Sequence, residues 1–170
     1  MSLLETPRDV LFFCSVLYND QFWDELKIRK IFEHFEFEIQ DELDPIENPL
    51  TKYYSKEMGE NLKRKIIIFK NRGSRDQLIE LKKITTDLEV DSMMDSKRTI
   101  NLDCGYLSLE NMVLATGKPY SHRIYLMDGV YAELTYKFEN KSFTSLPWTY
   151  PDYQHSEKID FFNKNRQALL

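Results

Sequence analysis

The sequence lacks any apolar run long enough to form a membrane-spanning helix. Its longest apolar stretch, residues 10–17, is interrupted by Cys14 and Ser15 and is far shorter than the roughly 20 residues that a span needs. The first residues also lack a basic segment followed by an apolar one, so no signal peptide is predicted. Residues 1–8 are expected to be disordered or foreign to the native chain. We therefore expect a cytoplasmic protein with no membrane segment.

Cysteine and glycine are scarce, and their placement excludes several kinds of site. Cys14 and Cys104 are far apart and form no Cys-X-X-Cys pair, which argues against a structural zinc site and favours reduced thiols. The five glycines form neither GxxxxGK(S/T) nor GxGxxG, so neither a P-loop nor a Rossmann dinucleotide site is expected. No spacing demands a metal ion, and the sequence leaves any cofactor unknown.

Positive charge is also in short supply. The chain has 28 acidic and 23 basic residues, a formal net charge of −5 at pH 7. Nonspecific nucleic-acid binding depends on a basic surface that releases counterions, so the charge argues against it, and a local basic patch such as Lys63-Arg64-Lys65 is the alternative. With 170 residues, 42% hydrophobic and 30% charged, the composition is typical of one soluble folded domain spanning 1–170. The oligomeric state is left open.

What the chain does have is a clear alternation of predicted strands and helices. The expected order is strand, helix, strand, strand, helix, strand, which is the order of a ferredoxin-like βαββαβ unit. An acidic stretch with two prolines, residues 41–50, is predicted to be a loop. The strands are expected at residues 10–17, 35–39, 65–69 and 98–103, and the helices at residues 20–35, capped by Asn19 or Asp20, and 74–88.

Beyond residue 103 we expect a short helix, a β-hairpin and a C-terminal helix. Ser108 is placed to cap a helix that ends at Gly117. Asp128-Gly129 is the sequence that a two-residue type I′ turn prefers, and strands at 123–127 and 130–136 flank it. Ser156 is placed to cap a last helix that runs to about residue 169. The predicted fold class is therefore α+β, a ferredoxin-like βαββαβ core with these three elements appended.

Ionisable and aromatic residues gather in the C-terminal half, where the sequence predicts a functional site. In a two-residue hairpin, Ile124 lies opposite Glu133, and His122 lies diagonal to Glu133 on the same face, within reach of it. A histidine oriented by a carboxylate is a common acid–base arrangement, although a purely structural pair is the alternative. If the strand already begins at His122, Arg123 points to the opposite face.

Asn101 and Asp103 share one face of the fourth strand, and Gly105 follows them. A strand, a glycine turn and a capped helix can present N–H groups to an anion, and an ordinary turn is the alternative. The segment 146–153, held extended by two prolines, either walls a pocket or straps a core face. The predicted catalytic residues are His122, Glu133 and Asp103, and the predicted ligand-binding residues are Asn101, Tyr106, Lys118, Tyr120, Arg123, Trp148 and Tyr153.

Four stretches of the chain carry a resemblance to a known family. They read YYSKEMG at 53–59 with LKR at 62–64, NLDCGYL at 101–107, VLAT at 113–116 leading to YSHRIYL at 120–126, and LPWTYPDY at 146–153. Together they resemble a bacterial family of uncharacterised proteins, domain of unknown function 4416. The family pattern has proline where this chain has Cys104, which argues against a role for that thiol. The resemblance implies a single-domain cytosolic bacterial protein and supplies no activity.

The residues favour a site for a small anionic or phosphate-bearing molecule, with or without catalysis. The basic Lys118 and Arg123 beside tyrosines suit such a ligand. The alternative is a module that binds RNA or a protein, using tyrosines of an open sheet face (Tyr125, Tyr131 and Tyr136) or the aromatic segment around Trp148.

Overall fold

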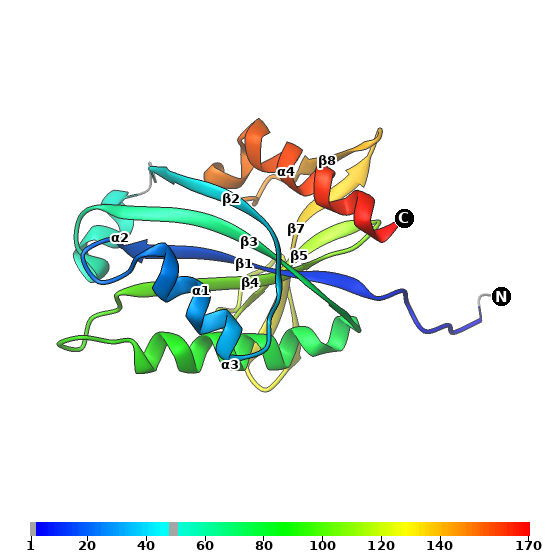
Figure 1. Cartoon of the computed structure of the whole chain (residues 1–170). Coiled ribbons are helices and arrows are strands. Elements are labelled where there is room, and N and C mark those ends of the chain that lie inside the picture. Colours follow the sequence, from blue (N-terminus) through cyan, green and yellow to red (C-terminus); the bar gives the residue numbers. More distant parts are fainter. Residues whose placement is uncertain (1–2, 48–50) are drawn as a thin grey trace.

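The computed structural model, which describes residues 3–47 and 51–170, contains one antiparallel sheet with helices on both faces (Figure 1). Residues 3–9 are exposed and belong to no helix or strand. Short 3₁₀ turns at Arg75–Gln77, Pro151–Gln154 and Gln167–Leu169 flank the later helices. The strands and helices are β1 (Val10–Asn19), α1 (Glu25–His34), β2 (Ile39–Glu47), α2 (Thr51–Met58), β3 (Leu62–Gly73), α3 (Leu78–Asp91), β4 (Ile100–Leu107), β5 (Asn111–Thr116), β6 (Arg123–Met127), β7 (Val130–Glu139), β8 (Ser142–Ser145) and α4 (Ser156–Arg166).

The sheet has eight strands in the described chain, more than a βαββαβ unit supplies. Its order is β2-β3-β1-β4-β5-β7-β6, with β8 pairing β7, and every neighbouring pair is antiparallel. The helices α1 and α3 connect β1 to β2 and β3 to β4 along the chain. The fold class is therefore α+β, as expected, with the predicted hairpin joined to the same sheet.

The core lies on both faces of the sheet, which explains the uninterrupted apolar sequence of β1. Alternate residues such as Phe12 and Val16 pack on the face that α1 and α3 cover, while Leu11 and Phe13 pack against α4 on the other face (Figure 1). Every residue of β1 is buried. A strand buried on both faces does not alternate between apolar and polar residues.

Residues 41–47 of the acidic segment predicted to be a loop form most of β2 instead, and residues 48–50 of that segment lie outside the described residues. Asp41 accepts hydrogen bonds from the Lys164 ammonium at 2.8 Å and the Asn165 amide at 2.9 Å, partners that lie far away in the sequence. Pro45 falls where the pairing with β3 shifts, between Leu43 and Ile46. β2 is an edge strand, where a proline costs no ladder hydrogen bond. The predicted strand at 35–39 contributes only its last residue.

The predicted helix from Ser108 to Gly117 is also wrong, because this segment forms β5. The Ser108 hydroxyl accepts hydrogen bonds from the backbone N–H groups of Glu110 and Asn111, which makes a tight turn and not a helix cap. Residues 112–115 are buried between β4 and β7. Long-range pairing thus decides the structure of a short apolar segment that its local sequence leaves ambiguous.

Turn chemistry accounts for the hairpins, one predicted and one missed. Asp128 and Gly129 have φ angles of +51° and +80°, the left-handed conformation that a type I′ turn requires at both positions. The missed hairpin joins β7 to β8 through Asn140 and Lys141, whose φ angles are +50° and +66°.

The first helix begins later than predicted, since Asp24 caps it and the Asn19 side chain bonds to Gln21 and Met58.

The sheet divides between β4 and β5, and this division positions the site. β1 pairs β4 from residue 100 to residue 107, but β5 pairs β4 only at residues 105–107. In the part of the chain that the structure describes, residues 100–104 of β4 therefore have no strand on their outer side. We call the space between this stretch and β5 the fork.

Gly105 lies where the fork begins, inside β4 and not in the predicted turn. A Cβ atom at this position would lie 2.4 Å from the Val113 carbonyl oxygen and 2.5 Å from the Phe13 ring. We expect Gly105→Ala to lower the free energy of unfolding by about 1–3 kcal/mol, the usual cost of overpacking, as measured by urea denaturation. Gly117→Ala is the control, because a Cβ there would meet no atom within 4 Å. Equal stability of both variants would contradict the packing role.

Candidate functional site

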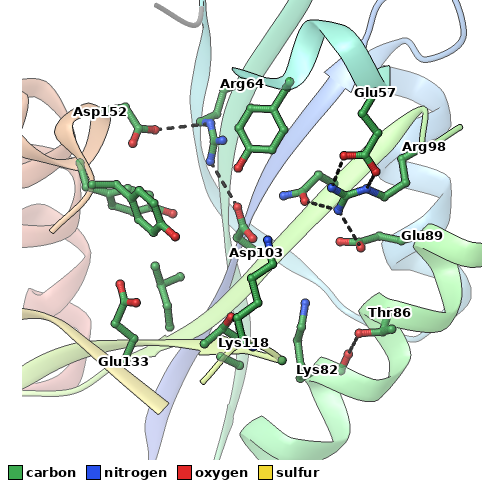
Figure 2. Close-up of a pocket in the computed structure, with 18 of the residues that line it drawn as sticks. Glu57, Arg64, Lys82, Thr86, Glu89, Arg98, Asp103, Lys118, Glu133 and Asp152 are labelled. Atoms are coloured by element: carbon green, nitrogen blue, oxygen red, sulfur yellow. Dashed lines mark hydrogen bonds and ion pairs between the residues drawn. The ribbon is translucent and has the colours of Figure 1, made fainter. Parts of the chain in front are cut away.

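A pocket of about 770 Å³ occupies the fork (Figure 2). Its walls come from α2, β3, α3, β4, the end of β5, β7 and residues 150–153. Six basic and five acidic side chains line it, so it is slightly basic although the whole chain is acidic. These side chains are Lys56, Arg64, Lys82, Arg98, Lys118 and Arg123, with Glu57, Glu89, Asp103, Glu133 and Asp152.

Arg64 connects two carboxylates on one side of the pocket. Its side chain is buried, and Nη1 donates to Ser15 Oγ at 3.0 Å and lies 3.4 Å from Asp103 Oδ2. The Nε atom lies 3.4 Å from Asp152 Oδ2, which also accepts a hydrogen bond from Lys158 Nζ at 2.9 Å. A buried charge is stable only when it is paired, so each member of this cluster holds the others in place.

Arg98 organises a second cluster across the pocket. Its guanidinium makes two parallel bonds to Glu57, with Nε–Oε1 at 2.6 Å and Nη2–Oε2 at 2.8 Å. Nη1 donates to Asn101 Oδ1 at 2.7 Å and lies 3.5 Å from Glu89 Oε2. The cluster therefore ties α2, α3 and β4 together. It also fixes the Asn101 amide, whose Nδ2 atom is buried and has no hydrogen-bond partner in the described chain.

Two side chains of α3 replace the strand that β4 lacks at the fork. The Leu102 N–H donates to Glu89 Oε1 at 2.5 Å, and Lys82 Nζ lies 3.4 Å from the Leu102 carbonyl oxygen. Burial raises the pKa of Glu89 despite the opposing effects of Lys82 and Leu102. Burial lowers the pKa of Lys82, but neighbouring Cys104, Glu89 and Asp103 outweigh it, so this pKa is raised.

Glu133 is held by both basic residues at the start of the hairpin. His122 Nε2 lies 3.2 Å from Glu133 Oε2, and Arg123 Nε donates to the same oxygen at 2.6 Å. The expected contact between His122 and Glu133 is therefore present. The expected register is wrong, because a shift between Tyr125 and Met127 places Arg123 opposite Glu133. Since β6 begins at Arg123, His122 precedes the strand and strand alternation does not separate the two side chains.

The aromatic segment 146–153 both straps β7 and walls the pocket. Trp148 Nε1 donates to the Leu134 carbonyl at 2.7 Å and Thr149 Oγ1 to the Thr135 carbonyl at 2.6 Å. The Trp148 indole stacks on the His122 imidazole, with ring centroids 5.3 Å apart and planes 14° apart. Farther along, Tyr150 and Tyr153 line the pocket.

Six of the ten residues predicted for the site line the pocket, and four do not. The four outside it include Tyr106, which lies under the Arg75 guanidinium, and Tyr120, which is exposed. His122 and Trp148 stack on each other, and His122 contacts Glu133 from outside the pocket lining. The six that line the pocket are Asn101, Asp103, Lys118, Arg123, Glu133 and Tyr153.

Sequence reasoning missed most of the basic residues of the pocket. Lys82, Thr86 and Glu89 have the i, i+4, i+7 spacing of one helix face, which was a usable signal on α3. Arg64 belongs to the LKR stretch that carries the family resemblance, which was a usable signal, whereas Arg98 lies before β4 with no local pattern that marks it. Among the tyrosines proposed for an RNA-binding face, Tyr136 is buried.

The thiols are poor candidates for chemistry. Cys14 and Cys104 are partners across β1 and β4, and both are buried. Burial raises the pKa of Cys104 to about 11 and that of Cys14 well above its ordinary value, so both are protonated at neutral pH.

Within residues 3–47 and 51–170, no group of three or more His, Cys, Asp or Glu is placed to hold a metal ion. No helix in the same ranges is long and apolar enough to cross a membrane.

The raised pKa of Glu89 predicts how the free energy of unfolding depends on pH. When the pH rises above 4.5, the ordinary pKa of glutamate, Glu89 loses its proton in the unfolded chain but keeps it in the folded chain. The free energy of unfolding of the wild type therefore falls until the pH passes the raised pKa of the folded state. Glu89→Gln cannot ionise, and its amide oxygen can still accept from Leu102. We expect the variant to become more stable than the wild type as the pH rises from about 4 to about 7. The free energy of unfolding of both proteins, measured by urea denaturation at each pH, tests this. Asp87→Asn, an exposed change on the same helix, is the control. A difference that stays constant with pH would contradict the burial effect.

Comparison with known proteins gives one match. The model of a family described as Domain of unknown function (DUF4416) matches residues 8–169. No curated protein and no solved structure matches significantly. The match covers nearly the whole chain, including every element that builds the pocket. The chain belongs to the DUF4416 family.

Proposed function

We propose that the pocket in the fork binds a small molecule that carries an anionic group such as a phosphate or carboxylate. The observation that carries this proposal is that, among the described residues, the arginines of the pocket have carboxylate partners and the lysines do not. The three arginines each lie within ion-pair distance of at least one lining carboxylate. Within the described chain, Lys56, Lys82 and Lys118 have no carboxylate within 4.0 Å of their ammonium groups. Lys82 and Lys118 extend into the pocket (Figure 2), where an anion would supply the missing partner.

Two buried polar atoms support a ligand with hydrogen-bonding groups as well. Asn101 Nδ2 is a donor and Glu133 Oε1 an acceptor, and neither has a partner in the described chain. A buried polar atom without a partner costs about 1–3 kcal/mol. A ligand that offers an acceptor near Asn101 and a donor near Glu133 would remove that cost.

An acid–base role at this site is a further part of the proposal. A carboxylate with a perturbed pKa in a pocket is a common feature of acid–base sites, and Glu89 meets that description. Asp103 is the member of the Arg64 cluster that faces Lys118 (Figure 2). His122, which does not line the pocket, would act by orienting Glu133.

We also infer that β1 to β4, with α1 and α3, form a ferredoxin-like unit. The strand order β2-β3-β1-β4 with antiparallel neighbours supports it. The unpaired thiols of Cys14 and Cys104, which are partners across two strands, support a reducing, cytoplasmic location.

The experiment is a thermal-shift titration with inorganic phosphate, pyrophosphate, nucleoside monophosphates and tricarboxylates, using uncharged nucleosides and sugars for comparison. We expect at least one anion to raise the melting temperature, because a ligand at 100 times its dissociation constant stabilises the folded state by about 2.7 kcal/mol. Lys82→Gln should remove most of that shift. Lys83→Gln, next to it on α3 and paired with Asp128, should retain it.

Two results would contradict anion binding in the fork. One is a panel of anions that leaves the melting temperature unchanged. The other is a shift of equal size in wild type, Lys82→Gln and Lys118→Gln, because an anion bound elsewhere would not depend on these lysines.

A further inference from the structure

The edge strand β6 exposes an apolar surface that the rest of the described chain leaves uncovered. Ile124 is 71% exposed, Tyr125 56% and Met127 51%, and Leu126 and Tyr120 are also exposed. Among the described residues, β6 pairs only with β7. Within the described chain, the only other hydrogen bond of its backbone is from the Arg123 N–H to the Tyr120 carbonyl. An open strand edge with apolar side chains is a template for pairing with another strand.

The opposite edge of the same sheet is protected, which makes the exposure of β6 significant. β2 carries Asp41, Glu42, Asp44 and Pro45 and has two register shifts in its pairing with β3. Charges, prolines and bulges are the usual devices that prevent edge-to-edge association. Between residues 124 and 127, β6 has one register shift in its pairing with β7 but neither charge nor proline, and the Arg123 guanidinium is already bound to Glu133.

We propose that β6 is a dimerisation strand, which pairs antiparallel with β6 of a second copy of this chain. A two-fold axis at Tyr125 would place this residue opposite the partner's Tyr125. The same register would pair Ile124 with the partner's Leu126, apolar against apolar, on both sides of the axis. No like charges would meet, so the strand is complementary to itself, as a two-fold interface requires.

Exposed apolar side chains lie on both faces of the sheet beside this edge, because neighbouring residues of a strand point to opposite faces. Taking roughly 200 Å² for a fully exposed side chain of this size, the five apolar side chains on and beside β6 present roughly 550 Å². Trp148 and Tyr150, which contact His122 and Arg123 at the start of the strand, raise this to roughly 700 Å². A stable interface buries about 800 Å² per partner, and pairing along β6 would bury the backbone of the edge and part of the side chains on each face.

The test is sedimentation equilibrium of the wild-type chain over a range of concentrations. We expect a mass of twice 20.4 kDa. Tyr125→Lys and Tyr125→Glu each place like charges directly opposite one another at the two-fold axis, which destabilises the pairing, so each should sediment at 20.4 kDa. Mixed in equal amounts, the two variants should recover the doubled mass, because lysine then faces glutamate.

Leu26→Lys is the matched control, since Leu26 is an exposed apolar residue on α1, away from β6. It should dimerise like wild type, and thermal unfolding followed by circular dichroism should show that all variants are folded. Three outcomes would overturn the proposal: a monomeric wild type at every concentration, a dimer that survives both Tyr125 variants, or a mixture that stays at 20.4 kDa. A wild-type monomer would assign the edge to a different protein.

Discussion

The early separation of β5 from β4 is the constraint on which the site depends. A buried strand backbone must find hydrogen-bond partners, and β4 loses its neighbouring strand at residues 100–104. Glu89 and Lys82 of α3 reach across to the N–H and carbonyl groups of Leu102. The fork is therefore kept open by side chains that are themselves charged. A continuous ladder would have filled the same space with backbone and left no room for a pocket.

The charges around the fork follow from this arrangement. Once Glu89 and Lys82 face the pocket, further charged groups can lie there only if they are paired, because burial in a low-dielectric interior penalises a lone charge. The arginines satisfy that condition through Asp103, Asp152, Glu57 and Glu133. The lysines stay at the rim or in the centre, where a ligand can reach them. The arginines therefore hold the pocket together through carboxylates, whereas Lys56, Lys82 and Lys118 have no carboxylate partner in the described chain, and Lys82 donates only to the Leu102 carbonyl.

The sequence predicted the parts of the structure that local chemistry decides. Apolar runs indicated β1 and β3, and Asp128-Gly129 indicated the β6–β7 hairpin. Strand alternation placed Asn101 and Asp103 on the same face, and both line the pocket. The errors fall where distant partners decide. Asp41 becomes part of β2, and its carboxylate binds residues of α4. Residues 112–115 become a strand because β4 and β7 enclose them. The role of Arg98 could not be found from its local sequence, and the resemblance marked Arg64 without giving its role, since both roles arise only when three or four elements meet.

Arg123 links the pocket to the open edge of the sheet. It lines the pocket through its bond to Glu133, and it is also the first residue of β6. Its guanidinium bonds to the Lys118 carbonyl and to the Tyr150 hydroxyl, so it also fixes the loop before the strand and the aromatic segment. A second strand paired along β6 would restrain the backbone of Arg123 and, through it, the orientation of Glu133. A partner at the edge and a ligand in the fork would then act on the same carboxylate, which is the physical route by which assembly could influence binding.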